Sequence, residues 1–222
     1  TWYAANLRWR VAEITYGSSF VLAGAIFFAF RYATEIAFAE QVLWSLLAHA
    51  TICLAANVLL RPLKIDWLRD TFGIPLGFAS LFASCCAAVL LAGLQSQPAP
   101  SATISSVACA WLAALWLAIA VLEAWPMLFG AFQVALSFAW LFGSAAWLTS
   151  HGWHWREPYS LQIYALGLAV LSLAWECARW TLRSQPGALA LISPQFVPID
   201  RLVSAAQILV QYFFTTLLVL WS

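Results

Sequence analysis

The chain has 222 residues, of which 64% are hydrophobic and only 9% are charged. Soluble domains average about 45–50% apolar and about 25% charged residues, so a soluble enzyme and a disordered chain are both excluded. Ten Lys or Arg residues against nine Asp or Glu residues give a net charge of +1, which provides no basic patch for nucleic acid. The composition predicts an all-α integral membrane protein that has the lipid bilayer as its main partner.

Seven apolar runs follow one another along the chain. A hydrocarbon core of about 30 Å needs roughly 20 helical residues to cross it. We therefore predict one seven-span transmembrane helical bundle over residues 1–222, with spans at about Val11–Phe30, Gln41–Leu60, Phe72–Leu94, Ala102–Ala124, Met127–Thr149, Leu161–Ala178 and Leu202–Trp221. Thr at position 1 and an end at Trp221-Ser222 suggest that these residues are a fragment of a longer chain.

The positive charges are distributed unevenly between the joints. Seven spans place eight cations on one side, namely Arg8, Arg10, Arg61, Lys64, Arg69, Arg179, Arg183 and Arg201, and leave Arg31 and Arg156 on the other. Because cytoplasmic loops carry an excess of Lys and Arg, we predict a cytoplasmic N-terminus and a C-terminus on the outer face. Trp2 and Trp9 are expected at the inner boundary, as part of an aromatic belt. The short loops and the cytoplasmic Arg excess suggest a bacterial inner (plasma) membrane.

The first and second spans each carry an ionisable side chain. At the inner end of the first span, Glu13 follows Arg10 by three residues, a spacing that allows an ion pair near the headgroups, and Glu176 and Arg179 repeat it in the sixth span. His49 lies near the middle of the second span, with Cys53 and Asn57 one and two turns later on the same face. We favour a neutral imidazole bonded to a neighbouring helix, and a haem ligand, metal ligand or proton relay is the alternative.

The third, fourth and fifth spans are dominated by small and apolar residues. Gly73 and Gly77 form a GxxxG pattern, which indicates close packing against another helix. The fourth and fifth spans are joined by little more than Trp125-Pro126, so we expect a tight antiparallel hairpin. Glu123 lies beside this joint, where a water-exposed carboxylate is favoured and an inward-facing proton carrier is the alternative.

The joint before the sixth span contains Ser150–Pro158, with His151, His154 and two tryptophans on the predicted outer side. Over these nine residues it resembles the tryptophan-rich outer segment of haem-handling cytochrome c assembly proteins, which would imply a haem contact through the histidines. It has Arg156-Glu157 where that family has an aspartate, and it lacks the family's flanking helix pattern. We favour an amphipathic interfacial loop.

The seventh span has a polar stripe. Ser204, Gln207, Gln211 and Thr215 recur at steps of three and four residues, so they share one helical face. We expect all four to point away from lipid, and we expect Gln211 to bond Asn57, Gln133 or Tyr164. The stripe is interpreted as interhelical hydrogen bonding or, alternatively, as the wall of a substrate path.

Three functions remain open at this point. No P-loop, HExxH, GxSxG or GxGxxG motif is present, and no Cys/His spacing suggests a metal site, so we predict no cofactor and favour a role without catalysis. The first is a membrane module or subunit of a larger protein or complex, associating through the third or seventh span. The second is a small secondary transporter whose path would involve His49, Asn57, Glu123, Gln207 and Gln211. The third is a haem- or redox-handling protein that uses His49, His151 and His154.

Overall fold

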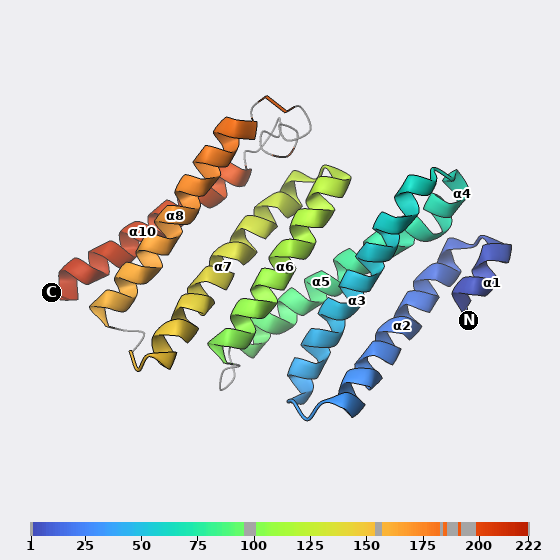
Figure 1. Cartoon of the computed structure of the whole chain (residues 1–222), viewed down its shortest axis with the longest axis horizontal. Coiled ribbons are helices and arrows are strands. Elements are labelled where there is room, and N and C mark those ends of the chain that lie inside the picture. Colours follow the sequence, from blue (N-terminus) through green and yellow to red (C-terminus); the bar gives the residue numbers. More distant parts are fainter. Residues whose placement is uncertain are drawn as a thin grey trace. The chain divides into compact units, whose positions relative to one another are not determined.

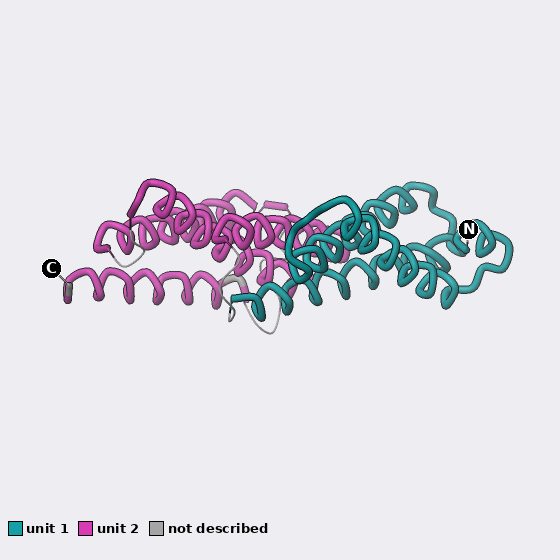
Figure 2. Tube along the Cα trace, turned by 90° about the horizontal axis from the view of Figure 1, so that it is seen from below, with its two compact units in different colours: residues 1–97 teal, residues 98–222 magenta. Residues whose placement is uncertain are grey.

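The computed structural model describes residues 2–95, 101–153, 157–182, 184–185, 191 and 199–221. The elements in these residues are helices (Figure 1). Seven of them are long and apolar enough to cross a membrane, the same number as the apolar runs that the sequence predicts. The chain divides into two compact units, Thr1–Gln97 and Pro98–Ser222, which Figure 2 distinguishes by colour.

The first unit contains three of the candidate spans, α2 (Ala12–Ala33), α3 (Phe38–Leu60) and α5 (Ile74–Leu94). The short helix α1 (Trp2–Trp9) precedes them. A 3₁₀ turn η1 (Arg61–Leu63), α4 (Asp66–Leu68) and a π-helical turn η2 (Arg69–Gly73) connect α3 to α5. Their core includes Leu68, Phe72 and Leu76 packed on Cys53, with Tyr3 of α1 against it.

The helix α1 folds back against α2. The turn between them has Arg10 in the left-handed region, with φ of 58°. Asn6 is fully buried and fixes this turn, since its Nδ2 donates to the Val11 carbonyl at 2.7 Å and its Oδ1 accepts from the Val11 amide at 2.8 Å. Nδ2 also donates to the Thr15 hydroxyl at 2.8 Å. The guanidinium of Arg10 lies 4.4 Å from the centre of the Trp67 ring, which is a cation–π contact. It makes no ion pair with Glu13. The predicted Arg10–Glu13 pair is therefore wrong, because the left-handed turn directs Arg10 toward α4.

A proline explains the polar contact between α2 and η2. Pro75 is the second residue of α5 and has no amide hydrogen to donate to the carbonyl four residues earlier, that of Thr71. The Thr71 carbonyl instead accepts from the Thr15 hydroxyl at 2.7 Å. The backbone group that Pro75 leaves without its usual partner thus becomes an interhelical contact.

The second unit contains α6 (Ala102–Glu123), α7 (Pro126–Ser150), α8 (Pro158–Leu182) and α10 (Ile199–Trp221). Ala124, with φ of 50°, and Trp125 alone join α6 to α7, and these two helices pack extensively, which confirms the predicted hairpin. Gly143 allows this close approach: a Cβ built there would come within 2.9 Å of the Ser106 hydroxyl oxygen. That hydroxyl donates to the Ala139 carbonyl at 2.8 Å, so a hydrogen bond also joins the two helices.

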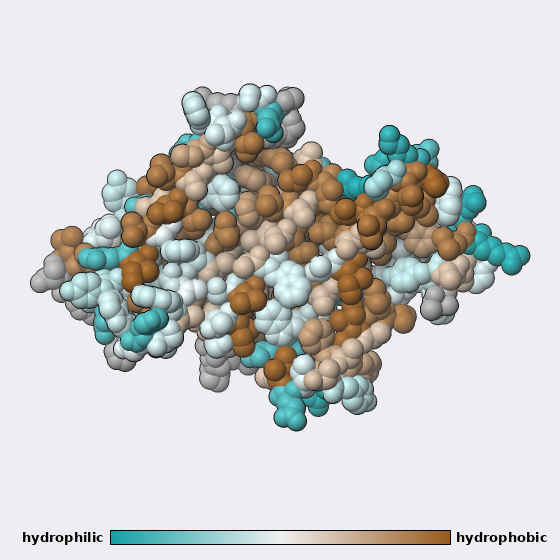
Figure 3. All heavy atoms as spheres, viewed as in Figure 1, coloured by the Kyte–Doolittle hydropathy of each residue, from teal (hydrophilic) through white to brown (hydrophobic). Residues whose placement is uncertain are grey.

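The ends of the helices agree in part with the predicted distribution of charge. In the first unit, α2, α3 and α5 run up and down in succession, so Arg8, Arg10, Arg61, Lys64 and Arg69 lie at one end and Arg31 at the other (Figure 1). In this unit, hydrophilic atoms gather near α1 and α4 and around the α2–α3 turn, with hydrophobic surface between them (Figure 3). Arg156 and Arg183 are outside the described residues. The cytoplasmic location of the N-terminus stays a prediction.

Candidate functional site

His49 lies in the interior of the first unit. Its side chain is 4% exposed, and its Nε2 lies 3.1 Å from the hydroxyl oxygen of Ser19 on α2. The Cys53 sulfur, one turn further along α3, is 3.6 Å from the same nitrogen and 3.9 Å from Nδ1. We name these three residues the His49 cluster. The arrangement matches the favoured interpretation of an imidazole bonded to a neighbouring helix.

Tyr3 approaches the His49 cluster from α1. Burial raises the pKa of the Tyr3 hydroxyl to about 12, the nearby Cys53 thiol adds to the increase, and a contact with Ser19 partly offsets it. Tyr3 is therefore a neutral phenol at physiological pH. Together with Asn6, it brings the folded-back helix α1 against the polar part of the bundle.

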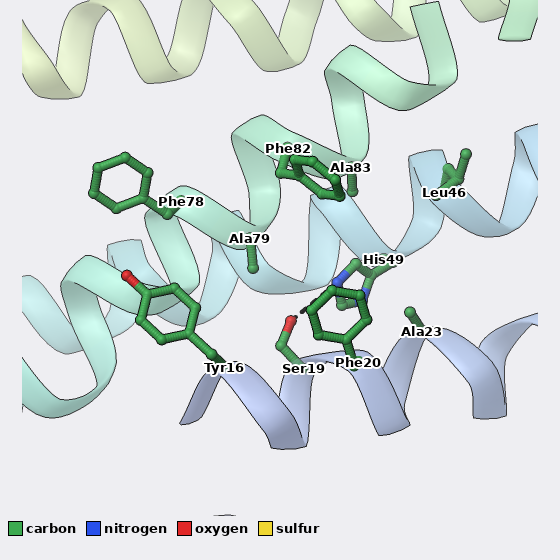
Figure 4. Close-up of a pocket in the computed structure, with 10 residues that line it drawn as sticks. All are labelled: Tyr16, Ser19, Phe20, Ala23, Leu46, His49, Phe78, Ala79, Phe82 and Ala83. Carbon is green, nitrogen blue, oxygen red and sulfur yellow. Dashed lines mark hydrogen bonds between the residues drawn. The ribbon is translucent and has the colours of Figure 1, made fainter. Parts of the chain in front are cut away.

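A pocket of about 400 Å³ opens beside the His49 cluster, between α2, α3 and α5 (Figure 4). Four aromatic side chains line it, namely Tyr16 and Phe20 of α2 and Phe78 and Phe82 of α5. Phe20 is 72% exposed and Phe82 is 64% exposed, whereas His49 and Ser19 are buried. The pocket therefore has aromatic walls that reach the surface of the unit and a polar pair in its depth.

Asn57 shares a helical face with His49 but makes different contacts. It is not among the residues that line the pocket. Its side chain packs over the GxxxG pattern formed by Gly73 of η2 and Gly77 of α5. A Cβ built at Gly73 would lie 3.5 Å from Asn57 Oδ1, and one built at Gly77 would lie 3.1 Å from Nδ2. This confirms the prediction that both glycines contact a neighbouring helix.

In the second unit, the polar stripe of α10 bonds to other helices through Gln207. This side chain is 5% exposed, its Nε2 donates to the Ser137 hydroxyl of α7 at 2.7 Å, and its Oε1 accepts from the Ser172 hydroxyl of α8 at 3.2 Å. We call these three residues the Gln207 seam. One turn earlier, Ser204 is buried and accepts from Arg179 of α8, which also pairs with Glu176. The predicted Glu176–Arg179 pair is confirmed.

The rest of the stripe departs from the prediction. Gln211 is half-buried, and its side-chain amide makes no hydrogen bond to the described residues of this unit, Gln133 and Tyr164 included. Thr215 is exposed, and its hydroxyl donates to the backbone carbonyls of Gln211 and Tyr212 in its own helix. These intrahelical bonds satisfy the hydroxyl, so Thr215 does not need the interior position expected for it. The interhelical bond expected at Gln211 forms one turn earlier, at Gln207.

The remaining candidates are at the ends of helices. Glu123 is exposed at the end of α6. His151 ends α7, where its ring lies 4.4 Å from that of Trp147 and its Nδ1 lies 2.8 Å from the Trp147 carbonyl oxygen. His154 is outside the described residues. Among the described residues, no three His, Cys, Asp or Glu side chains are grouped as a metal site would require.

Sequence reasoning did not single out Ser19 or the aromatic walls of the pocket. Ser18-Ser19 in the middle of an apolar run was the signal that could have indicated Ser19. The walls gave no such signal, because Phe side chains are ordinary in a membrane span. No protein-family model matches the sequence, and neither a curated protein nor a solved structure is significantly similar to it.

Proposed function

We propose that this chain is a non-catalytic integral-membrane module, which serves as a subunit or membrane part of a larger protein or complex. The observation that carries this proposal is the Gln207 seam. A transport path along α10 would need its buried amide to face a cavity, whereas the buried amide of Gln207 bonds side chains of α7 and α8. A pocket in the second unit is lined by residues of α6, α7 and α8, such as Ser106, Trp140 and Ile163, and by none of α10.

The polar groups of the first unit support the same proposal. Asn6 donates to the Thr15 hydroxyl, which in turn donates to the Thr71 carbonyl. Asn57 covers Gly73 of η2 and Gly77 of α5. The small-residue face of the third span, α5, is occupied by α3. Association with a partner or a second copy is therefore better assigned to the seventh span, α10. The bacterial inner membrane is part of this proposal and rests on the short loops and the charge distribution.

Replacing Gln207 by Leu tests the structural role of the stripe. Gln207→Leu removes two interhelical hydrogen bonds, and such bonds contribute about 0.6 kcal/mol each and up to about 2 kcal/mol. Ser137 donates to the Gln133 carbonyl of its own helix at 2.8 Å. The single hydroxyl hydrogen of Ser172 is shared between Gln207 and the Leu168 carbonyl, at 3.2 and 2.9 Å, so neither serine is left without a partner in the variant. We expect a loss of about 1–2 kcal/mol in the free energy of unfolding, measured by SDS titration in mixed micelles.

Gln211→Leu is the matched control, because it makes the same change one turn away on the same helix. We expect its unfolding free energy to stay within about 0.5 kcal/mol of the unmodified chain. Equal stability of the Gln207→Leu variant and the unmodified chain would contradict a packing role and would favour the transporter.

A further inference from the structure

The pocket beside His49 has the features of a ligand site in the first unit. Its volume of about 400 Å³ lies within the range of about 300–1,000 Å³ that is typical of small-molecule pockets. His49 and Ser19 are both at least nine-tenths buried, and both line it. Figure 4 shows their hydrogen bond between the aromatic side chains of α2 and α5.

The lining indicates an uncharged ligand. No Asp, Glu, Lys or Arg lines the pocket, and His49 lies near the middle of a 23-residue apolar helix. A charged group at that depth would cost at least about 2.5 kcal/mol with nothing in the pocket to neutralise it. An uncharged molecule that dissolves in the hydrocarbon of the bilayer has no such cost.

The shape of the lining favours a ring. Phe20 on one side and Phe78 and Phe82 on the other present aromatic faces and edges, which pair with flat rings at offset or edge-on geometry. Ala23 and Ala79 leave space between them, because their side chains are single methyl groups. The exposed positions of the phenylalanines open this space to the side of the unit, where lipid surrounds a membrane-spanning helix.

The polar pair has a hydrogen to donate. A neutral imidazole and a serine hydroxyl together hold one N–H and one O–H hydrogen, and their mutual bond uses one of the two. The Tyr3 hydroxyl approaches Ser19 but makes no hydrogen bond with the described residues. The other hydrogen therefore has the Cys53 sulfur, at 3.6 to 3.9 Å, as its acceptor in the cluster, and a thiol sulfur is a weak acceptor. A carbonyl oxygen entering the pocket would be a much better acceptor.

We propose that this pocket binds an uncharged, lipid-soluble ring compound that carries a carbonyl group, which accepts a hydrogen bond from the His49–Ser19 pair. The ligand enters from the hydrocarbon between α2 and α5. Its ring packs against Phe20, Phe78 and Phe82. This site is independent of the module proposed above, since the Gln207 seam belongs to the other unit.

Two probe compounds distinguish the contribution of the ring to binding from that of the carbonyl group. Decyl-substituted benzoquinone has a flat ring and carbonyl oxygens, and decylbenzene has a similar size with no hydrogen-bonding group. Binding is measured by equilibrium partition into lipid nanodiscs that hold the full chain, with empty nanodiscs subtracted. We expect the unmodified chain to bind the quinone on the order of tenfold more tightly than decylbenzene, as one hydrogen bond would provide.

Three variants locate the binding. Ala23→Phe fills the pocket and is expected to weaken binding of both probes at least about tenfold, while Ala25→Phe, on the same helix outside the lining, is expected to leave both unchanged. His49→Phe is expected to abolish the preference for the quinone and to keep decylbenzene binding. The proposal is overturned if the Ala23→Phe variant binds both probes like the unmodified chain, or if the His49→Phe variant keeps the preference.

Discussion

Asn57 shows how one polar side chain in a span can be used entirely for packing. Its amide lies over Gly73 and Gly77, where the missing side chains leave room for it between α3 and α5. The residue is 5% exposed, so this contact excludes lipid and water from the polar group. A polar residue in a membrane helix is costly unless it is sheltered in this way.

The contact between Asn57 and Gly77 can be tested by a substitution. We expect Gly77→Leu to destabilise the folded protein. A side chain at position 77 would begin 3.1 Å from Asn57 Nδ2 and would force the two helices apart. Overpacking of this kind costs typically about 1–3 kcal/mol, and we expect a loss of that size in the unfolding free energy measured in SDS mixed micelles. Gly93→Leu is the control on the same helix, since a Cβ there meets no atom within 4 Å. Equal losses in both variants would show that Asn57 is not the cause.

At the scale of the element, α1 is the part of the fold that differs most from expectation. The sequence placed Trp2 and Trp9 together at the inner boundary, but the turn at Arg10 reverses the chain. Asn6 faces Thr15 and Tyr3 reaches Ser19, which lies seven residues into α2, or about 10 Å along it. Trp2 and Trp9 therefore lie at opposite ends of the folded-back helix α1.

The docking of α1 depends on Asn6. Asn6→Ala removes three hydrogen bonds and leaves the Val11 amide without its side-chain acceptor, at a cost of about 1–3 kcal/mol. We expect amide hydrogen exchange in α1 to speed up about tenfold or more, with little change in α3. Leu7→Ala is the control, because Leu7 is exposed on the same helix. Unchanged exchange in the Asn6→Ala variant would mean that other contacts hold α1 in place.

At the scale of the whole molecule, the chain is built as two compact units, one with α2, α3 and α5 and one with α6, α7, α8 and α10. Each has its own polar contacts, the His49 cluster in the first and the Gln207 seam in the second. A variant in one unit is therefore expected to leave the polar contacts of the other in place.

The orientation of the chain can be tested by cysteine labelling in intact cells. We expect a membrane-impermeant maleimide to label the Arg31→Cys and Arg156→Cys variants from outside, and the Lys64→Cys variant only after permeabilisation, because the excess of cations stays in the cytoplasm. The unmodified chain, whose five cysteines lie in spans, gives the background. Labelling of positions 64 and 156 from the same side would refute the seven-span topology.

Features that depend only on residues close together in the chain could be predicted from the sequence alone. Seven spans, the hairpin at Trp125-Pro126 and the Glu176–Arg179 pair all follow from run length, proline placement and helical spacing, which a single segment carries. Which polar groups come into contact depends instead on how the helices pack against one another. The sequence grouped Gln207 and Gln211 on one face, but only the rotation and height of α10 against α7 and α8 bring Gln207, and not Gln211, to Ser137 and Ser172. The pocket beside His49 likewise requires side chains from α2, α3 and α5, whose relative positions are set by packing across helices and not by any one of them.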